Sequence, residues 1–145
     1  RATALGIAPA VRFAGTLRDT RVALTTMDVF VFLPAVQEGF GLSLLEAMAS
    51  GLPIVAIRRG GGSAWVLDES HVGVTVEPDD VQGLGAAIVR LLHDPAYANQ
   101  LGAQARAIAK TRYILDRMVV QIEAVYQEAL RRSTAEEATT APRDG

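Results

Sequence analysis

The stretch DVFVFLPAVQEGFGLSLLEAMASGLPIVAI (residues 28–57) decides the fold. The strands predicted at residues 28–33 and 53–57 are apolar at nearly every position, which is typical of parallel strands covered on both faces. Between them lie a loop with two glycines and a predicted helix at residues 42–50. A strand, a helix and a second strand in this order predict a βαβ unit with a parallel sheet.

Strands and helices alternate on both sides of this unit. Short β-branched or aromatic runs predict further strands at residues 11–13 and 72–76. Helices are expected at residues 18–27 and 63–68. The fold class is therefore predicted to be α/β, with a Rossmann-like parallel sheet and flanking helices.

The second half of the chain is predicted to be helical. Asp79 or Asp80 can cap a helix that stops at His93-Asp94-Pro95, because proline disfavours helix at and before its own position. Two further helices are expected at about residues 96–110 and 114–132. The side chains that these three helices are expected to bury are Leu84, Ile88, Leu91, Leu92, Leu101, Ala105, Ile108, Met118, Ile122, Val125 and Leu130. Residues 133–145 are polar and are expected to be a disordered tail, so the predicted domain covers residues 1–132.

Composition narrows the classes of function. The 145 residues include no cysteine and two histidines, and the formal net charge is -2. Disulfides and thiolate metal sites are excluded, no metal is expected, and nucleic acid is a poor partner for such a chain. No apolar run approaches the roughly 18 residues that span a bilayer. A cytoplasmic protein is expected, with peripheral contact to a membrane left open.

The loop at residues 34–41 and the helix behind it form a candidate anion site. They follow the carboxyl end of a predicted parallel strand, where open α/β sheets bind ligands. The helix N-terminus offers unpaired N–H groups that suit phosphate, and Gly39 and Gly41 let a ligand approach the backbone. Glu38 and Glu46 frame this site, and their natural partners are hydroxyl groups. Hydroxyls on both sides of a diphosphate are the pattern of a nucleotide sugar.

The sequence EGFGLSLLEAMASGLPIVA (residues 38–56) is similar to the E-x7-E signature of the retaining glycosyltransferases with the GT-B fold (glycosyl transferases group 1, family 4 type). Other family motifs follow in the expected order, namely VRFAG (11–15), MDVFVFLP (27–34), GGG (60–62), GVTVEPDD (73–80) and HDP (93–95). The resemblance covers residues 1 to about 130. It identifies the chain as part of the C-terminal, donor-binding domain of such an enzyme.

The resemblance implies a role for individual residues. Glu38 would contact the hydroxyls of the transferred sugar at the catalytic centre, and Glu46 would bind the ribose hydroxyls. The backbone N–H groups that would face the sugar and diphosphate are those of Gly39, Phe40, Gly41 and Leu42. The residues that would face the base are Thr16, Leu17 and Arg18. The implied reaction transfers a hexose, with retention and without a metal, from a UDP-, GDP- or ADP-linked donor to a glycan, lipid or small-molecule acceptor.

Two departures from the family pattern affect this interpretation. Trp65 stands where the family usually has Glu, and residues 1–27 match neither the family's first two strands nor its diphosphate-gripping Arg and Lys. The chain is therefore expected to be an incomplete domain that is inactive alone, and either to pair with another chain through an exposed sheet edge or to be cut from a longer chain. Two alternatives stay open: a degenerate, non-catalytic glycosyltransferase-like binding or assembly domain, and another GT-B enzyme such as a sugar-nucleotide epimerase.

Overall fold

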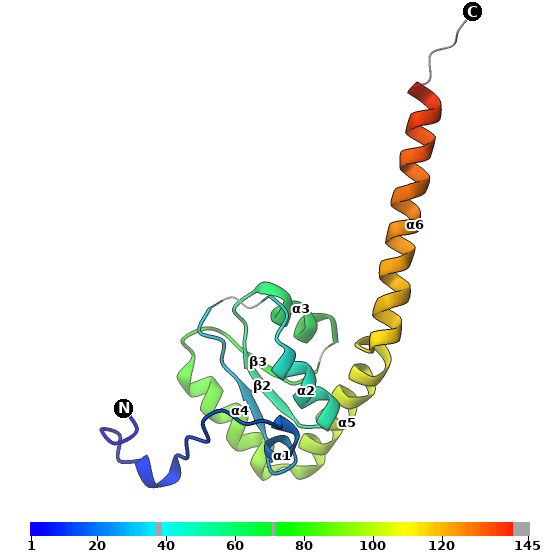
Figure 1. The fold of residues 1–145 in the computed structure, drawn as a ribbon. Helices are drawn as coiled ribbons and strands as arrows, with labels where there is room; N and C mark the ends of the chain where they lie inside the picture. Colours follow the sequence, from blue (N-terminus) through cyan, green and yellow to red (C-terminus); the bar gives the residue numbers. More distant parts are fainter. Residues whose placement is uncertain (37–38, 71, 141–145) are drawn as a thin grey trace, which may run out of the picture.

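A computed structural model describes residues 1–36, 39–70 and 72–140 of the chain. In chain order its elements are η1 (Ala8–Ala10), α1 (Thr20–Leu24), β1 (Phe30–Phe32), α2 (Leu42–Ser50), β2 (Ile54–Ile57), α3 (Gly61–Ser70), β3 (Val74–Val76), α4 (Val81–His93), α5 (Pro95–Arg112) and α6 (Leu115–Thr140). Helices flank the sheet, and α6 projects from this body as a long arm (Figure 1).

The sheet is parallel, with the strand order β1-β2-β3. Val31 of β1 is in register with Val55 of β2, and Val55 is in register with Val74 of β3. The strands come from the segments that the sequence predicts at residues 28–33, 53–57 and 72–76. The predicted α/β class, with a parallel sheet and flanking helices, is confirmed.

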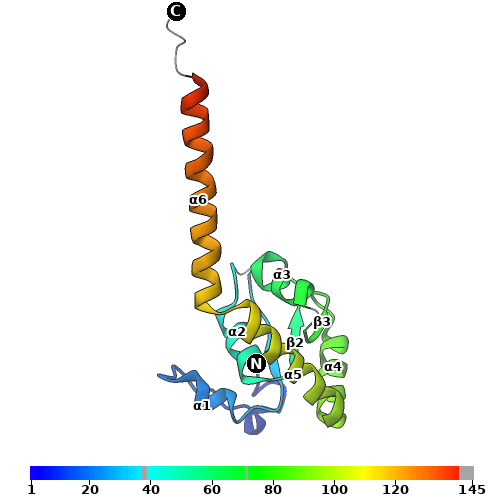
Figure 2. The same ribbon diagram turned by 90° about the vertical axis from the view of Figure 1, so that its right-hand side faces the viewer.

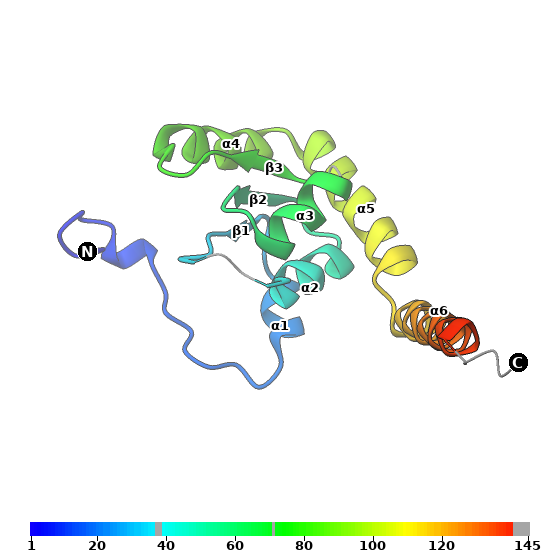
Figure 3. The same ribbon diagram turned by 90° about the horizontal axis from the view of Figure 1, so that it is seen from above.

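The sheet has an apolar core on each face, because successive side chains of a strand point to opposite sides. On one face Ile54 and Ala56 pack in a cluster with Leu44 and Met48 of α2. On the other face Val55 packs with residues of α4 and α5. Figure 3 shows α4 on one side of the sheet and α2 and α3 on the other. The two-sided burial that the apolar sequence of β2 predicts is therefore present.

Local signals place the helix ends where the sequence predicts them. Gly41 and Gly51 flank α2 as its N-cap and C-cap residues, and both take a left-handed conformation with φ 78°. Asp80 caps α4 by accepting a hydrogen bond from the Gly83 N–H at 2.8 Å. Asp94 is the C-cap residue of α4, where its N–H donates to the Arg90 carbonyl oxygen. Its side chain also caps α5 by accepting a hydrogen bond from the Tyr97 N–H at 3.0 Å.

The N-terminal part of the chain differs from its prediction. Residues 11–13 form no strand, and Phe13 is 87% exposed. A strand needs a neighbour for its backbone groups, and none lies beside these residues in the described part of the chain. The segment instead runs as an extended arm before α1 (Figure 3). The helix predicted at residues 18–27 is also shorter, since α1 has five residues, with Asp19 as its N-cap.

The expected buried residues are wrong for α6 and in part for α4. Met118, Ile122, Val125 and Leu130 are each at least 45% exposed. No other described element lies along α6 after its start, as two perpendicular views show (Figures 1 and 2), so nothing covers its apolar face. On α4, Leu92 is exposed and Ala87 is buried.

The end of α6 also differs from the sequence prediction. The helix continues past Arg132 to Thr140, so it occupies the first part of the predicted disordered tail. Residues 141–145 lie outside the described residues, and for them the tail stays a prediction. None of the helices in the described part of the chain is both long and apolar enough to cross a membrane.

Gly102 allows α5 to pack closely against the end of α2. A Cβ at this position would overlap the carbonyl oxygen of Gly51 and would lie 3.0 Å from its carbonyl carbon. Gly85 in α4 provides a contrast, because no atom lies within 4 Å of a Cβ built there.

Gly102→Ala is expected to lower the free energy of unfolding by about 1–3 kcal/mol, because the added methyl group forces the two helices apart. The matched Gly85→Ala is expected to raise it by up to about 1 kcal/mol, because alanine favours the helix and meets no neighbour. Urea denaturation followed by circular dichroism measures both changes. A Gly102→Ala protein as stable as the unsubstituted chain would contradict the close packing of α2 and α5.

Candidate functional site

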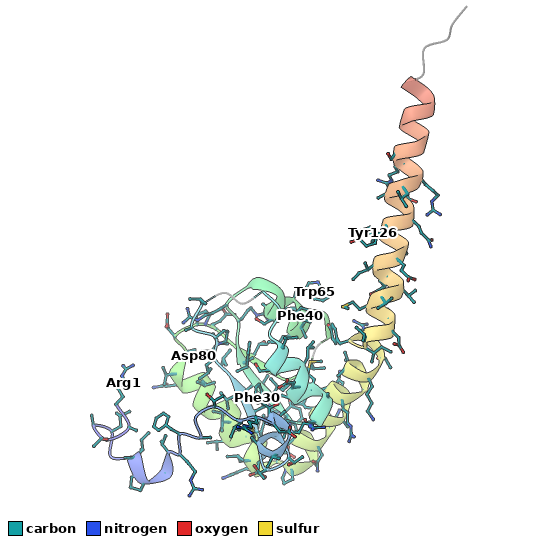
Figure 4. All side chains as sticks on the ribbon, in the orientation of Figure 1. Arg1, Phe30, Phe40, Trp65, Asp80 and Tyr126 are labelled. Atoms are coloured by element: carbon teal, nitrogen blue, oxygen red, sulfur yellow. The ribbon has the colours of Figure 1, made fainter. Side chains whose placement is uncertain are left out.

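The candidate site lies at the carboxyl ends of β1 and β2, where the chain leaves each strand and enters a helix. The loop after β1 leads into α2, and the loop after β2 leads into α3 through Gly60, Gly61 and Gly62. Phe40, at the start of α2, and Trp65, on α3, are both labelled near this end of the molecule in Figure 4. The site is thus built from two strand-loop-helix units, as expected at the carboxyl edge of a parallel sheet.

The N-terminus of α2 presents uncapped backbone N–H groups. Gly41 is its N-cap residue, and no side chain forms a capping hydrogen bond there. The Gly41 carbonyl accepts from the N–H groups of Leu44 and Leu45 at 3.0 and 3.3 Å, which starts the helix. The N–H groups before these have no partner inside the helix and carry the positive end of its dipole. This end of α2 is suited to bind an anion.

Glycine is required at position 41 for two reasons. Its φ of 78° is a conformation that other residues rarely adopt. A Cβ there would also lie 3.2 Å from Cβ of Ser63 and 3.3 Å from Cζ of Phe32. The backbone at the start of α2 therefore stays close to both α3 and β1.

The triple glycine holds the loop in place from the other side. A Cβ at Gly62 would overlap the Gly39 carbonyl oxygen and would lie 3.1 Å from Cα of Phe40. Gly39 itself is open, since no atom lies within 4 Å of a Cβ built on it. From the sequence, the triple glycine is only a family motif; its contact with residues 39 and 40 emerges from the structure.

Glu46 lies on the exposed side of α2, about one turn beyond the helix N-terminus. Its Oε2 atom accepts a hydrogen bond of 3.1 Å from Oγ1 of Thr20, the first residue of α1. Helix α1 is held against α2 by Leu24, which is buried with Ala47 and Leu52. Thr20 is a contact that the sequence analysis misses, because nothing in the sequence pairs it with Glu46.

The segment predicted to face the base comes directly before the Thr20–Glu46 contact in the chain. Thr16, Leu17 and Arg18 are exposed and precede α1. Because one residue spans at most about 3.6 Å, Cα of Arg18 lies within roughly 7 Å of Cα of Thr20. Asp19 caps α1, and the hydrogen bonds from Arg21 hold the pKa of the Asp19 carboxyl below its usual value.

The predicted site residues are therefore placed as follows. Gly39, Phe40, Gly41 and Leu42 form the end of the loop and the start of α2. Glu46 is one turn along the same helix, and residues 16–18 precede α1, whose first residue, Thr20, contacts Glu46. Glu38 lies outside the described residues, so its catalytic role stays a prediction. Across the described ranges, no three His, Cys, Asp or Glu side chains gather into a group that could hold a metal ion. The expected independence of a metal also stays a prediction.

A cavity of about 670 Å³ opens beside the start of α2. Its walls come from Phe40, Leu42, Trp65 of α3, and Tyr113 and Met118 at the junction of α5 and α6. The rings of Phe40 and Tyr113 meet edge to face, with centroids 6.1 Å apart and planes at 72°. The sequence analysis does not find this cavity, because its walls come from segments far apart in the chain.

Comparison with known proteins identifies the family. The family model for glycosyl transferases group 1 matches residues 1–94. The chain is 36% identical over 132 residues to the MMP alpha-(1->4)-mannosyltransferase of Mycolicibacterium hassiacum, and the match covers 90% of this chain and 32% of that protein. It is 41% identical over 98 residues to the glycogen synthase of Mycobacterium tuberculosis strain H37Rv, with 67% of this chain and 23% of that protein covered.

Solved structures agree with this assignment. Anabaena Alr3699/HepE, solved in complex with UDP, matches with a TM-score of 0.81 and 26% identity over 88% of this chain and 35% of that chain. Sucrose-phosphate synthase from Thermosynechococcus elongatus matches with a TM-score of 0.76 and 28% identity over 90% of this chain and 33% of that chain. The chain thus spans about a third of the length of these proteins and of the mannosyltransferase. On its sequence, its parallel α/β fold and these matches, the chain belongs to the glycosyl transferases group 1 family.

Proposed function

We propose that the chain provides the nucleotide-sugar binding part of a retaining glycosyltransferase, which transfers a hexose from a UDP-, GDP- or ADP-linked donor. The family assignment supports a transferase. Anabaena Alr3699/HepE was solved with UDP and with UDP-glucose, which supports a nucleotide-sugar donor for this chain as well. Because the chain spans about a third of its relatives, the activity is proposed for the whole enzyme.

The uncapped N-terminus of α2, with Glu46 one turn behind it, carries this proposal. The first-turn N–H groups and the helix dipole offer a partial positive charge to the diphosphate. The exposed Glu46 carboxylate can accept hydrogen bonds from the ribose hydroxyls, as it accepts one from Thr20. A donor spread along α2 in this way would place its base near Thr16, Leu17 and Arg18.

The sugar end of the donor would lie beside the loop. In this proposal the backbone N–H groups of Gly39, Phe40, Gly41 and Leu42 face the sugar and the diphosphate, and Glu38 contacts the sugar hydroxyls. The helix N-terminus stabilises charge on the departing diphosphate, which is the task that a metal ion performs in other sites. The reaction is proposed to need no metal.

Glu46→Ala is expected to weaken UDP binding at least tenfold, because the charge-assisted hydrogen bonds to the ribose are lost. Glu123→Ala is the matched control, since Glu123 is an exposed carboxylate on α6. Isothermal titration calorimetry with UDP, GDP and ADP measures both variants and identifies the base. Equal affinities of the Glu46→Ala and Glu123→Ala proteins would remove Glu46 from the site.

Trp65 favours a second candidate, a degenerate glycosyltransferase-like domain that binds or assembles without catalysis. This residue stands where the family usually has Glu, and it is 54% exposed beside the loop. The same titrations on the whole enzyme separate the two candidates, because an enzyme that binds none of the three nucleotides does not have a working donor site. For the whole enzyme, a product assay distinguishes glycosyl transfer from sugar-nucleotide epimerisation.

The outer edge of β1 supports the proposed self-association. Within the described residues β1 pairs only with β2, and Val31 and Leu33 are 36% and 49% exposed. An unpaired apolar strand edge offers backbone groups to a second chain.

Val31→Lys is expected to reduce self-association of the chain, because a charged side chain on an edge strand opposes pairing. Val89→Lys is the control, since Val89 is an exposed apolar residue on α4. Sedimentation velocity at several protein concentrations gives the fraction of dimer. If both variants associate as the unsubstituted chain does, the β1 edge is not the contact.

A further inference from the structure

Thr20 and Glu46 join α1 to α2 through their side chains. Oγ1 of Thr20 donates a hydrogen bond of 3.1 Å to Oε2 of Glu46, and both residues are exposed. Within the described residues, no arginine or lysine forms an ion pair with the Glu46 carboxylate, and the Thr20 hydroxyl is its one hydrogen-bond donor. Thr20 is therefore the side chain that orients this carboxylate.

The backbone that carries Thr20 is fixed by the packing of α1 on α2. Leu24 is one turn further along α1, so it lies on the same face of the helix as Thr20. It is 5% exposed and packs in a cluster with Ala47, the residue after Glu46. Figure 3 shows α1 beside α2. Because threonine is branched at Cβ, its χ1 angle is restricted as well. The hydroxyl thus reaches Glu46 from a fixed position.

The Glu46 side chain is directed along α2 toward the start of the helix. Each Cα–Cβ bond of an α-helix is tilted toward the N-terminus, so a long side chain lies over the preceding turn. That turn begins at Gly41 and Leu42, where the diphosphate is proposed to bind. A carboxylate has about four lone-pair sites, and Thr20 uses one of them on Oε2. The remaining sites can accept two neighbouring hydroxyl groups while the Thr20 contact stays in place.

The hydrogen bond from Thr20 removes freedom that Glu46 would otherwise lose when a ligand binds. A glutamate side chain has several rotatable bonds, and fixing them costs conformational entropy. A side chain that is already held in its binding orientation avoids part of this cost at the moment of binding. The fold itself depends little on this exposed hydroxyl, because Leu24 already holds α1 on α2.

We propose that Thr20 is a positioning residue of the donor site: its hydroxyl holds the Glu46 carboxylate in the orientation that accepts the 2′- and 3′-hydroxyl groups of the donor's ribose. Thr20 thereby raises the preference of the site for ribonucleotides over 2′-deoxyribonucleotides. It acts through Glu46 and does not itself contact the donor. The inference rests on the proposed function, since it takes Glu46 as the ligand of the ribose.

UDP and 2′-deoxy-UDP are the probes, and isothermal titration calorimetry on the whole enzyme gives the ratio of their affinities. If the titrations described above identify GDP or ADP as the ligand, that nucleotide and its 2′-deoxy form take their place. Thr20→Val keeps the shape of the side chain but removes the hydroxyl, and it is expected to reduce the preference for UDP at least about threefold. Thr20→Ser keeps the hydroxyl and is expected to retain the preference within about twofold.

Thr25→Val is the matched control. Thr25 is the C-cap residue of α1, and its hydroxyl donates to the Val22 carbonyl oxygen at 2.9 Å, away from Glu46. A loss of helix stability weakens the binding of UDP and of 2′-deoxy-UDP equally, so a merely structural role leaves the ratio of the two affinities unchanged. Thr25→Val is accordingly expected to leave this ratio as it is in the unsubstituted enzyme.

The double variant Thr20→Val/Glu46→Ala tests whether Thr20 acts through Glu46. In the Glu46→Ala enzyme, the further change Thr20→Val is expected to alter the affinity for UDP by less than about twofold, because no carboxylate is left to orient. A larger further loss would mean that Thr20 contacts the donor directly, and it would overturn the inference.

The same measurements separate a failure of this inference from a failure of the proposed function. If Glu46→Ala weakens UDP binding but Thr20→Val and Thr25→Val both keep the ratio of the unsubstituted enzyme, Glu46 stays in the donor site and Thr20 has no positioning role. If Glu46→Ala leaves the affinity for UDP unchanged, Glu46 is not a ligand of the ribose, and the proposed donor geometry and this inference fail together.

Discussion

The burial of β2 on both faces is the constraint on which the rest of the structure depends. Ile54 and Ala56 are covered by the cluster that includes α2 and α3, and Val55 by the cluster of α4 and α5. A three-stranded sheet has few residues that can pack against the two layers of helices. Each apolar position of β2 is therefore important for the packing of the core. The same packing brings the N-termini of α2 and α3 to one edge of the sheet. The position of the candidate site therefore follows from how the helices pack on the sheet.

Much of this core could be predicted from the sequence, and the reason is local. Strand β2 is apolar throughout and α2 lies between two glycines, so each carries its own signal. Two of the failures have the same cause. Residues 11–13 and the apolar face of α6 have the pattern of buried segments, but a pattern shows only that a surface is apolar. It does not show whether another element covers that surface, and none does among the described residues.

For the candidate site as well, some features could be predicted from the sequence and others could not. The place of Gly39 and Gly41 between a strand and a helix could be predicted, because the strand and the helix each have a local signal. Their role in binding a donor stays a prediction. The hydrogen bond from Thr20 to Glu46 joins residues 26 positions apart, and the contact of Gly62 with Gly39 joins the first turn of α3 to the loop before α2. The cavity requires the end of α5 to meet Phe40. Such contacts depend on how the helices pack on the sheet, and the spacing of residues in the sequence does not predict that packing.

The α6 arm links the cavity wall to a point far outside the rest of the described chain. At 1.5 Å per residue its 26 residues extend for roughly 39 Å, while its first turns, with Leu115 and Met118, form part of the cavity wall. A helix of this length behaves as a stiff lever with its fulcrum near Tyr113. A displacement of about 3 Å at its far end corresponds to a rotation of only about 4° at the junction. Leu115 and Met118 lie close to that fulcrum, so a movement of the end of the arm changes the space beside Phe40 by only a small fraction of that movement.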